Sequence, residues 1–344
     1  MPITIPRPDD WHLHVRDGDA LAAVVPHTAR QFARAVIMPN LKPPVTTVAQ
    51  ALAYRERILA AVPDGADFRP LMTLYLTDAT TPDEIARAAA CEHVLALKLY
   101  PAGATTNSAA GVTDMAKVDA ALAAMAAGGL PLLVHGEVTD PAVDIFDREA
   151  VFIERVLLPL LDRHPDLRVC LEHVTTRQGV EFVRSAGPRV AGTLTAHHLL
   201  WNRNAIFSGG LNPHAYCLPV LKRESHREAL LAAATGGEPC FFLGTDSAPH
   251  PRDAKESACG CAGIYTAHAA LELYAAAFAA AGKLENLAKF ASLNGPAWHG
   301  LPVNDGTVTL VEETWRVPAS YGFGAGTVVP MLAGEELGWK LADG

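Results

Sequence analysis

The chain has 344 residues, of which 50% are hydrophobic and 19% are charged. This composition is typical of a globular protein with a large core and excludes an intrinsically disordered one. The formal net charge of -9 argues against a surface that binds nucleic acid, although a local arginine can still bind a small anion.

Short apolar segments rich in Val, Leu and Phe alternate with Ala-rich segments of helical length. The expected strands are 11–15, 34–39, 69–76, 94–100, 131–137, 168–174, 189–197 and 240–246. The expected helices are 19–33, 47–61, 82–91, 114–127, 141–162, 176–185, 222–234 and 263–281. Strands that alternate with helices predict βα units and a parallel sheet.

Eight such units favour a closed (β/α)8 barrel of the TIM type over an open, doubly wound sheet. An open sheet would usually carry a glycine-rich phosphate-binding turn after its first strand, and HVRDGDAL contains no such motif. We expect a single domain over 1–344, with the barrel at about 9–281. A further helix at 284–293 and strand-like pieces such as TVTLVEETWRV predict a short C-terminal extension over 282–344 that packs on the barrel.

We expect a cytoplasmic protein that does not associate with membranes. The segment MPITIPRPDDW has neither a basic start nor an apolar core, so it does not indicate a signal peptide. The longest apolar stretches, such as AALAAMAAGGLPLLV, are shorter than a bilayer span. The six cysteines are then expected to be reduced, and Cys259 and Cys261 are interpreted as loop or buried thiols because no second pair completes a tetrahedral metal site.

Polar and ionisable side chains interrupt the apolar strands near one end. A lone histidine in such a place is more often a hydrogen-bonded core residue than a ligand. Here, however, five strands place a metal-competent side chain at the end where a parallel barrel builds its active site. These residues are His12 and His14 on the first strand, Lys98 on the fourth, His135 on the fifth, His173 on the sixth and Asp246 at the end of the eighth, with Asn40 ending the second.

The residue types indicate two metal ions. Side chains alternate along a strand, so His12 and His14 should point to one face, and two imidazoles on one face suit zinc. Lys98 is the unusual member, since a charged amine would repel a cation. It is either a neutral amine or a carbamate formed with CO2, whose two oxygens can bridge two metals. Four histidines and one aspartate are too many ligands for one tetrahedral zinc, so we favour the carbamate.

Longer motifs extend this pattern. DWHLHVRDG, VIMPNLKPP, ALKLYPAGATTNS, LLVHGEV, LEHVTT, NPHAYCLPVLKR, FLGTDSAPHPRDAKE and CGCAG resemble the class II (bacterial-type) dihydroorotases of the amidohydrolase superfamily. The similarity covers residues 9 to about 263 and extends towards the end of the chain. It implies a TIM-barrel hydrolase that reversibly cyclises N-carbamoyl-L-aspartate to L-dihydroorotate, the third step of pyrimidine synthesis.

The resemblance also implies a role for each matching residue. One zinc would be bound by His12, His14, carboxylated Lys98 and Asp246, and a second by Lys98, His135 and His173, with a hydroxide between them as nucleophile. Asp246 would act as general base and acid. The substrate would contact Arg16, Asn40 and His250 through its α-carboxylate, the backbone of Leu218 and Ala262, and also His14 and His135. Thr105 and Thr106 would belong to a mobile loop, and the enzyme would be a homodimer.

Two alternatives stay open. Another cyclic amidohydrolase, such as a dihydropyrimidinase, hydantoinase or allantoinase, can act on substrates without a carboxylate, so Arg16 with Asn40 is the discriminating feature. A catalytically silent relative would be expected to have lost ligands, whereas this chain has all six candidate ligand residues. The remaining histidines, including His197, His198 and His214, are assigned to structure, and cobalt or manganese would suit the same ligands as zinc.

Overall fold

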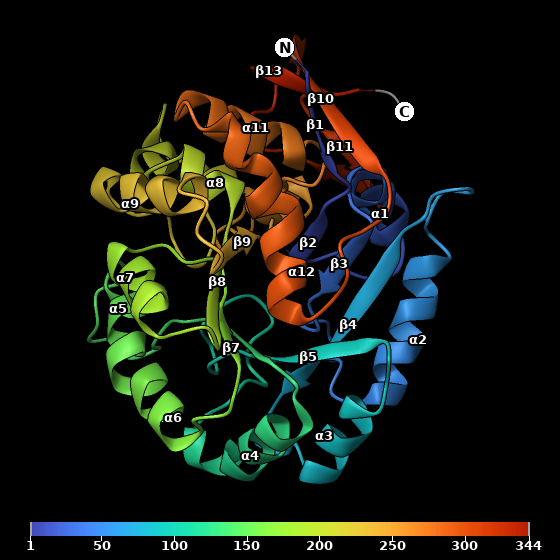
Figure 1. Cartoon of the computed structure of the whole chain (residues 1–344). Coiled ribbons are helices and arrows are strands. Elements are labelled where there is room, and N and C mark those ends of the chain that lie inside the picture. The colour runs from blue at the N-terminus through green and yellow to red at the C-terminus, as the bar shows by residue number, and fades with distance from the viewer. Residues whose placement is uncertain (1, 343–344) are drawn as a thin grey trace.

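The computed structural model describes residues 2–342, and eight parallel strands form its centre (Figure 1). They are β2 (Asp9–Leu13), β3 (Arg34–Ile37), β4 (Arg69–Leu76), β5 (Val94–Leu99), β6 (Leu132–Val134), β7 (Val169–Leu171), β8 (Val190–Leu194) and β9 (Phe241–Leu243). Each strand pairs with the next along the chain, and a parallel bridge between Leu13 and Ser247 brings the first strand beside the last. The predicted (β/α)8 barrel is therefore confirmed.

Helices surround the barrel (Figure 1). They are α1 (Ala20–Gln31), α2 (Val48–Leu59), α3 (Pro82–Ala89), α4 (Asp119–Gly128), α5 (Arg148–Phe152), α6 (Leu158–Arg163), α7 (Arg177–Ser185), α8 (Ala196–Leu200), α9 (Glu224–Thr235), α10 (Arg252–Lys255), α11 (Ala270–Ala280) and α12 (Asn294–His299). Shorter 3-10 turns are η1 (Met115–Val118), η3 (Arg203–Phe207), η4 (Pro213–Ala215) and η5 (Leu284–Asn286), and η2 (Ile153–Leu157) and η6 (Lys289–Leu293) are π-helical. Within residues 2–342 no helix is long and apolar enough to cross a membrane.

Several helices begin where their sequence favours a cap. The hydroxyls of Thr47, Thr81, Thr176 and Thr195 accept hydrogen bonds from the backbone N–H three residues on, which satisfies a donor that the helix itself leaves free. The prediction of one helix over 141–162 was wrong in detail, because α5 begins only at Arg148 and a π-helical turn separates it from α6. Helix α8 was not expected, since the predicted strand 189–197 included its first two residues and its last three were assigned to no element.

The strands also end earlier than the sequence suggested. His14, His135, His173 and Asp246 follow β2, β6, β7 and β9 rather than lying within them. Positive φ angles of 41° at His173 and 44° at Asp246 interrupt the extended backbone at these points. His12 and Lys98, in contrast, lie inside β2 and β5.

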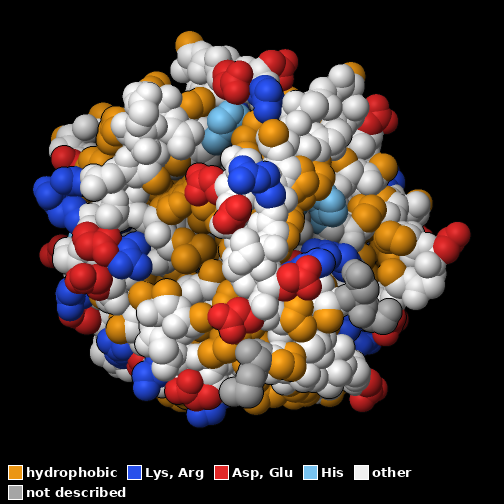
Figure 2. All heavy atoms as spheres, turned by 90° about the horizontal axis from the view of Figure 1, so that it is seen from above, with side chains coloured by type: hydrophobic (Ala, Val, Ile, Leu, Met, Phe, Trp, Pro, Cys, Tyr) orange, Lys and Arg blue, Asp and Glu red, His pale blue; other side chains and the backbone are white. Residues whose placement is uncertain are grey.

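A second sheet joins the two ends of the chain. Its antiparallel strands are β1 (Ile3–Pro6), β10 (Thr307–Arg316) and β13 (Glu336–Leu341), in the order β1-β10-β13, and β11 (Tyr321–Phe323) pairs with β12 (Gly326–Val328) as a separate hairpin. The participation of β1 was not anticipated. Figure 1 shows both termini beside this sheet, and in Figure 2 acidic and basic side chains are interspersed over the face seen from above.

Buried side chains fill one end of the barrel, and the candidate site is at the other end. Trp11, Met38 and Phe242 belong to a buried cluster in which Trp11 stacks on His299 of α12, with ring centroids 4.2 Å apart. A Cβ on Gly295 would lie 2.0 Å from Trp11 Nε1, so only glycine allows α12 to approach this closely. The candidate site lies at the opposite, C-terminal ends of the strands.

Candidate metal centre and active site

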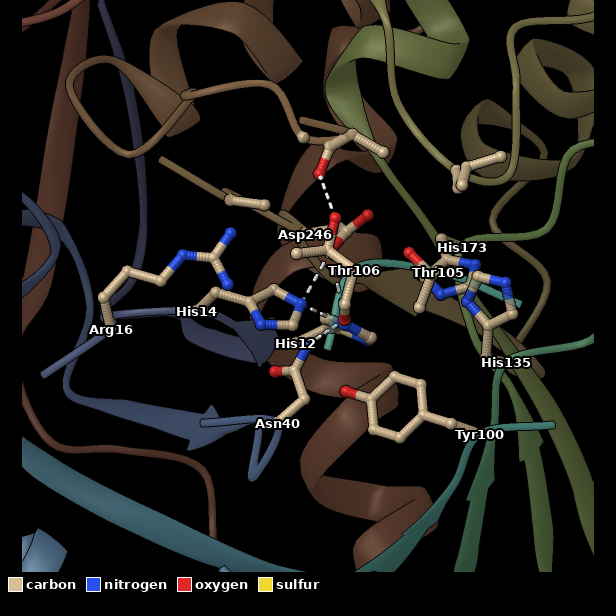
Figure 3. A pocket seen from close by; sticks show the side chains of 14 residues that line it. His12, His14, Arg16, Asn40, Tyr100, Thr105, Thr106, His135, His173 and Asp246 are labelled. Carbon is tan, nitrogen blue, oxygen red and sulfur yellow. Dashed lines mark hydrogen bonds and ion pairs between the residues drawn. The ribbon is translucent and has the colours of Figure 1, made fainter. Parts of the chain in front are cut away.

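A pocket at the C-terminal ends of the barrel strands contains most of the predicted site residues (Figure 3). Its lining is His12, His14, Arg16, Asn40, Tyr100, Thr105, Thr106, His135, His173, Leu218, Asp246, Ala248, Ala262 and Gly263. Of the residues predicted from the sequence, Lys98 and His250 are outside this lining. His250 contacts the lining residues Arg16 and Ala262, and Lys98 Nζ lies 5.2 Å from the ring centroid of Tyr100. Tyr100 was not predicted, although it follows directly after the strand that carries Lys98.

His12, His14 and Asp246 form a compact group of potential metal ligands. One ligand atom from each lies within 4.8 Å of the others, and all three residues are buried. Asp246 Oδ1 is 3.1 Å from His14 Nε2 and 3.4 Å from His12 Nε2, and the two Nε2 atoms are 3.4 Å apart. Burial lowers the pKa of His14 to about 4, so its imidazole is neutral at neutral pH, as metal binding requires.

His173, His135 and Lys98 lie beside this group. The ring of His173 is 5.1 Å from that of His12 and 4.8 Å from that of His135, measured between centroids. Lys98 is fully buried, and burial lowers its pKa to about 8. Neither Lys98 Nζ nor His173 Nδ1 has a hydrogen-bond partner among residues 2–342. Unpartnered polar atoms in a buried site are where a modification or an ion is expected, so this donor set fits a second metal and a modified lysine.

Two buried glutamates orient the histidines. Glu172 Oε2 lies 2.7 Å from His12 Nδ1 and also accepts a hydrogen bond from Thr193, and Glu137 Oε2 lies 2.8 Å from His135 Nε2. A carboxylate on one ring nitrogen fixes the tautomer and leaves the other nitrogen for a metal. Neither glutamate was predicted from the sequence, although each lies within two residues of a candidate ligand histidine, in LEHVTT and LLVHGEV.

The turn that carries Asp246 is tied to the first strand. Asp246 donates its backbone N–H to the carbonyl of His12 at 2.8 Å. The Asp10 carboxylate accepts hydrogen bonds from the backbone N–H of Thr245 at 2.9 Å and from its hydroxyl at 2.6 Å. These bonds hold Asp246 in its positive-φ conformation, which is uncommon for a residue with a side chain.

Arg16 and His250 form the other side of the pocket. Arg16 has a φ of 60°, so the first strand does not continue to it, yet its side chain still faces the pocket (Figure 3). Its Nε donates to the carbonyl of Pro249 at 2.9 Å, and its Nη2 lies 3.0 Å from His250 Nε2. The same His250 nitrogen is 3.0 Å from the carbonyl of Ala262. One nitrogen cannot accept from Arg16 and donate to Ala262, so the tautomer decides which bond forms. Burial lowers the pKa of His250 to about 2, so the ring is neutral.

The loop that carries Thr105 and Thr106 lies over the pocket. Asn40 donates through Nδ2 to the carbonyl of Thr106 at 3.2 Å, and Asn107 donates to the carbonyl of Asn40 at 3.0 Å. The Thr106 hydroxyl donates to the carbonyl of Ala262 at 3.3 Å. Asn40 therefore links this loop to the barrel, in addition to lining the pocket.

Lys255 joins the two backbone segments that carry Leu218 and Ala262. It is buried, with 3% of its surface exposed. Its Nζ donates to three carbonyls, those of Tyr216 at 2.8 Å, Cys261 at 2.9 Å and Gly263 at 2.8 Å. Sequence reasoning did not assign it a role, because nothing in FLGTDSAPHPRDAKE shows that this lysine turns back into the structure.

The chain matches the model of the amidohydrolase family over residues 5–310. It is 67% identical over 338 residues to a dihydroorotase of Cupriavidus taiwanensis, and the match covers 98% of both sequences. The chain belongs to the dihydroorotases of this family. Among solved structures, the family member from Campylobacter jejuni is 36% identical, with a TM-score of 0.91 over 99% of this chain and 98% of that one. The dihydroorotase from Saccharomyces cerevisiae, solved with 5-fluoroorotic acid, is 33% identical with the same TM-score and the same coverage of both chains. The resemblance found in the sequence is thus confirmed.

Proposed function

We propose that this chain reversibly cyclises N-carbamoyl-L-aspartate to L-dihydroorotate at a centre that holds two zinc ions. The observation that carries the proposal is one pocket in which His12, His14 and Asp246 face Arg16, so that metal ligands lie beside a cation that can bind a carboxylate. High identity to dihydroorotases over almost the whole chain supports this reaction over that of other cyclic amidohydrolases.

The buried donors suit two ions. His12, His14 and Asp246 would hold one, and His135 and His173 the other, with a carboxylated Lys98 shared between them. Lys98 Nζ is buried and has no hydrogen-bond partner among residues 2–342, which supports the modification. When bound, the ions would lower the pKa of a water molecule towards about 7 and polarise the amide carbonyl.

Asp246 moves the proton. In ring opening its carboxylate accepts a proton from the attacking water and delivers it to the ring nitrogen as the C–N bond breaks. In ring closure it takes a proton from the carbamoyl nitrogen. The backbone bonds from Asp246 to His12 and from Thr245 to Asp10 hold the turn that positions this carboxylate.

Arg16, Asn40 and His250 would select a substrate with an α-carboxylate. Because Arg16 Nε is bonded to Pro249, a carboxylate would have to approach the terminal nitrogens of the guanidinium. The backbone groups of Leu218 and Ala262 would then contact the ring, and the loop with Thr105 and Thr106 would open and close for substrate exchange.

We further propose that the enzyme is a cytoplasmic homodimer. All six cysteines are unpaired in the structure, which suits a reducing compartment. Sedimentation velocity would test the dimer, which predicts twice the mass of a 36.5 kDa chain.

The reaction is tested by adding N-carbamoyl-L-aspartate at mildly acidic pH and following ring formation by ultraviolet absorbance. We expect turnover that falls when a chelator removes the metal. No turnover by a sample that contains two metal ions per chain would overturn the proposal, and turnover only of a neutral hydantoin or dihydropyrimidine would favour the other cyclic amidohydrolases. Less than one zinc per chain after metal-replete expression would favour a silent relative.

A further inference from the structure

A second cluster of potential metal ligands lies outside the lining of the active-site pocket. His197 and His198 are adjacent in α8, the helix directly after barrel strand β8 (Figure 1). Cys217 lies in the segment after η4. Their exposed fractions are 0%, 2% and 1%, and one ligand atom from each lies within 4.8 Å of the others.

His197 is the member that a purely structural role does not explain. Neither Nδ1 nor Nε2 has a hydrogen-bond partner in the part of the chain that the structure describes, although the residue is fully buried. A neutral imidazole has one donor and one acceptor, and burying both without partners is unfavourable. Such an atom in a native interior indicates a bound water molecule or an ion.

His198 and Cys217 already have the arrangement of two ligands on one ion. Cys217 Sγ is 3.8 Å from His198 Nε2, close to the separation of about 3.5 Å that zinc–sulfur and zinc–nitrogen bonds give on a tetrahedron. The other ring nitrogen of His198 is 2.7 Å from the Thr195 hydroxyl, which can orient the ring as partners of metal-bound histidines do. Without an ion, the carbonyl oxygen of Pro219 accepts hydrogen bonds from His198 Nε2 at 3.1 Å and from Cys217 Sγ at 3.2 Å, and a bound ion would have to replace both bonds.

We propose that His197, His198 and Cys217 bind a third metal ion, a thiophilic one such as Zn2+, with the Pro219 carbonyl at the fourth position. Two imidazoles and a thiolate are ligands that zinc prefers. Burial raises the pKa of Cys217 to about 12, so the thiol is protonated without the ion and binding must release that proton.

This ion would act on the substrate pocket through the backbone. Cys217 directly precedes Leu218, which lines the pocket. Fixing the Cys217 side chain to α8 would hold the backbone groups that Leu218 presents. Loss of the third ion should therefore raise KM several-fold and change kcat less, because Asp246 lies on another turn.

Cobalt distinguishes this site from the two-metal centre. A thiolate bound to Co2+ gives a sulfur-to-cobalt charge-transfer band in the near ultraviolet, whereas the candidate ligands of the two-metal centre contain no sulfur. The experiment uses full-length protein with Cys259→Ser and Cys261→Ser, because these two sulfurs lie 3.7 Å apart and would give a band of their own. Co2+ is added to the metal-free protein, and zinc content is measured in parallel by elemental analysis.

We expect the charge-transfer band in this background. Adding Cys217→Ser should abolish the band and lower the zinc content by one ion per chain. Cys91→Ser in the same background is the matched control, because Cys91 is a partly buried thiol outside the cluster, and it should change neither reading. If Cys217→Ser does not fold, His197→Gln decides, since the His197 ring makes no hydrogen bond within residues 2–342 that the fold would lose. The proposed third site would be overturned if the background protein bound two ions per chain and gave no band, or if the band survived both Cys217→Ser and His197→Gln. Either result would leave the proposed function unaffected.

Discussion

Lys255→Met should loosen the proposed substrate pocket without altering the proposed metal ligands. The variant removes three hydrogen bonds from a charged donor, each of which typically contributes about 1.5–3 kcal/mol. The carbonyl of Tyr216 keeps a second partner, the backbone N–H of Gly263 at 3.0 Å, and water can reach a loosened loop. We therefore expect a loss of about 3–5 kcal/mol in the free energy of unfolding, less than the simple sum.

Part of this loss should appear in substrate affinity. If about 2 kcal/mol is needed to reorder the segments around Leu218 and Ala262 when substrate binds, kcat/KM falls about 30-fold, mostly through KM. The assays are urea unfolding and steady-state cyclisation at fixed metal content. Lys222→Met is the matched control, since Lys222 is also buried but donates only one described hydrogen bond, to Val220 at 3.0 Å. Wild-type kcat/KM and stability in Lys255→Met, or an equal effect in Lys222→Met, would refute the reasoning.

Four further substitutions test the proposed site. Asp246→Asn should keep the fold by circular dichroism and lower kcat at least about 100-fold, and a variant with near wild-type turnover would exclude Asp246 as the proton carrier. Arg16→Gln should raise KM for carbamoyl aspartate by about 30-fold, the equivalent of 2 kcal/mol for a lost carboxylate contact; an unchanged KM would place the carboxylate elsewhere. Lys98→Ala should lose metal and activity, with short carboxylic acids restoring part of both, whereas full metal content without them would contradict a bridging carbamate. Glu172→Gln should weaken metal binding about 10–100-fold in a chelator competition, because a neutral amide replaces the carboxylate that orients His12; unchanged affinity would make Glu172 merely structural.

The sequence predicted the barrel and the residues of its rim well, because both depend on local patterns. Apolar runs separated by helical segments locate the strands, and a polar residue at the end of such a run stands out. His12, His14 and Asp246 are therefore predicted from the sequence alone, and the structure brings them together.

What the sequence could not show depends on contacts between distant segments. Glu172 contacts His12, which is 160 residues away in the sequence. The Lys255 ammonium donates to backbone carbonyls, which every residue has, so no sequence motif marks its partners. The ends of the strands were placed too late for a different reason. Strand propensity favours Val and Leu at any position in a predicted strand. At His173 and Asp246, however, the backbone has positive φ angles and is no longer extended, which orients their side chains.

The pairing of β1 with β10 sets an order for folding during synthesis. Ile3 pairs with Leu310, and β10 is the only neighbour of β1 in its sheet as described. During synthesis β1 leaves the ribosome long before β10, so β1 stays unpaired until most of the chain has been made. A product that stops before Thr307 would expose the backbone of β1 as an unpaired edge, and such edges promote aggregation. The sheet thus makes the synthesis of β10 a condition for pairing the backbone of β1.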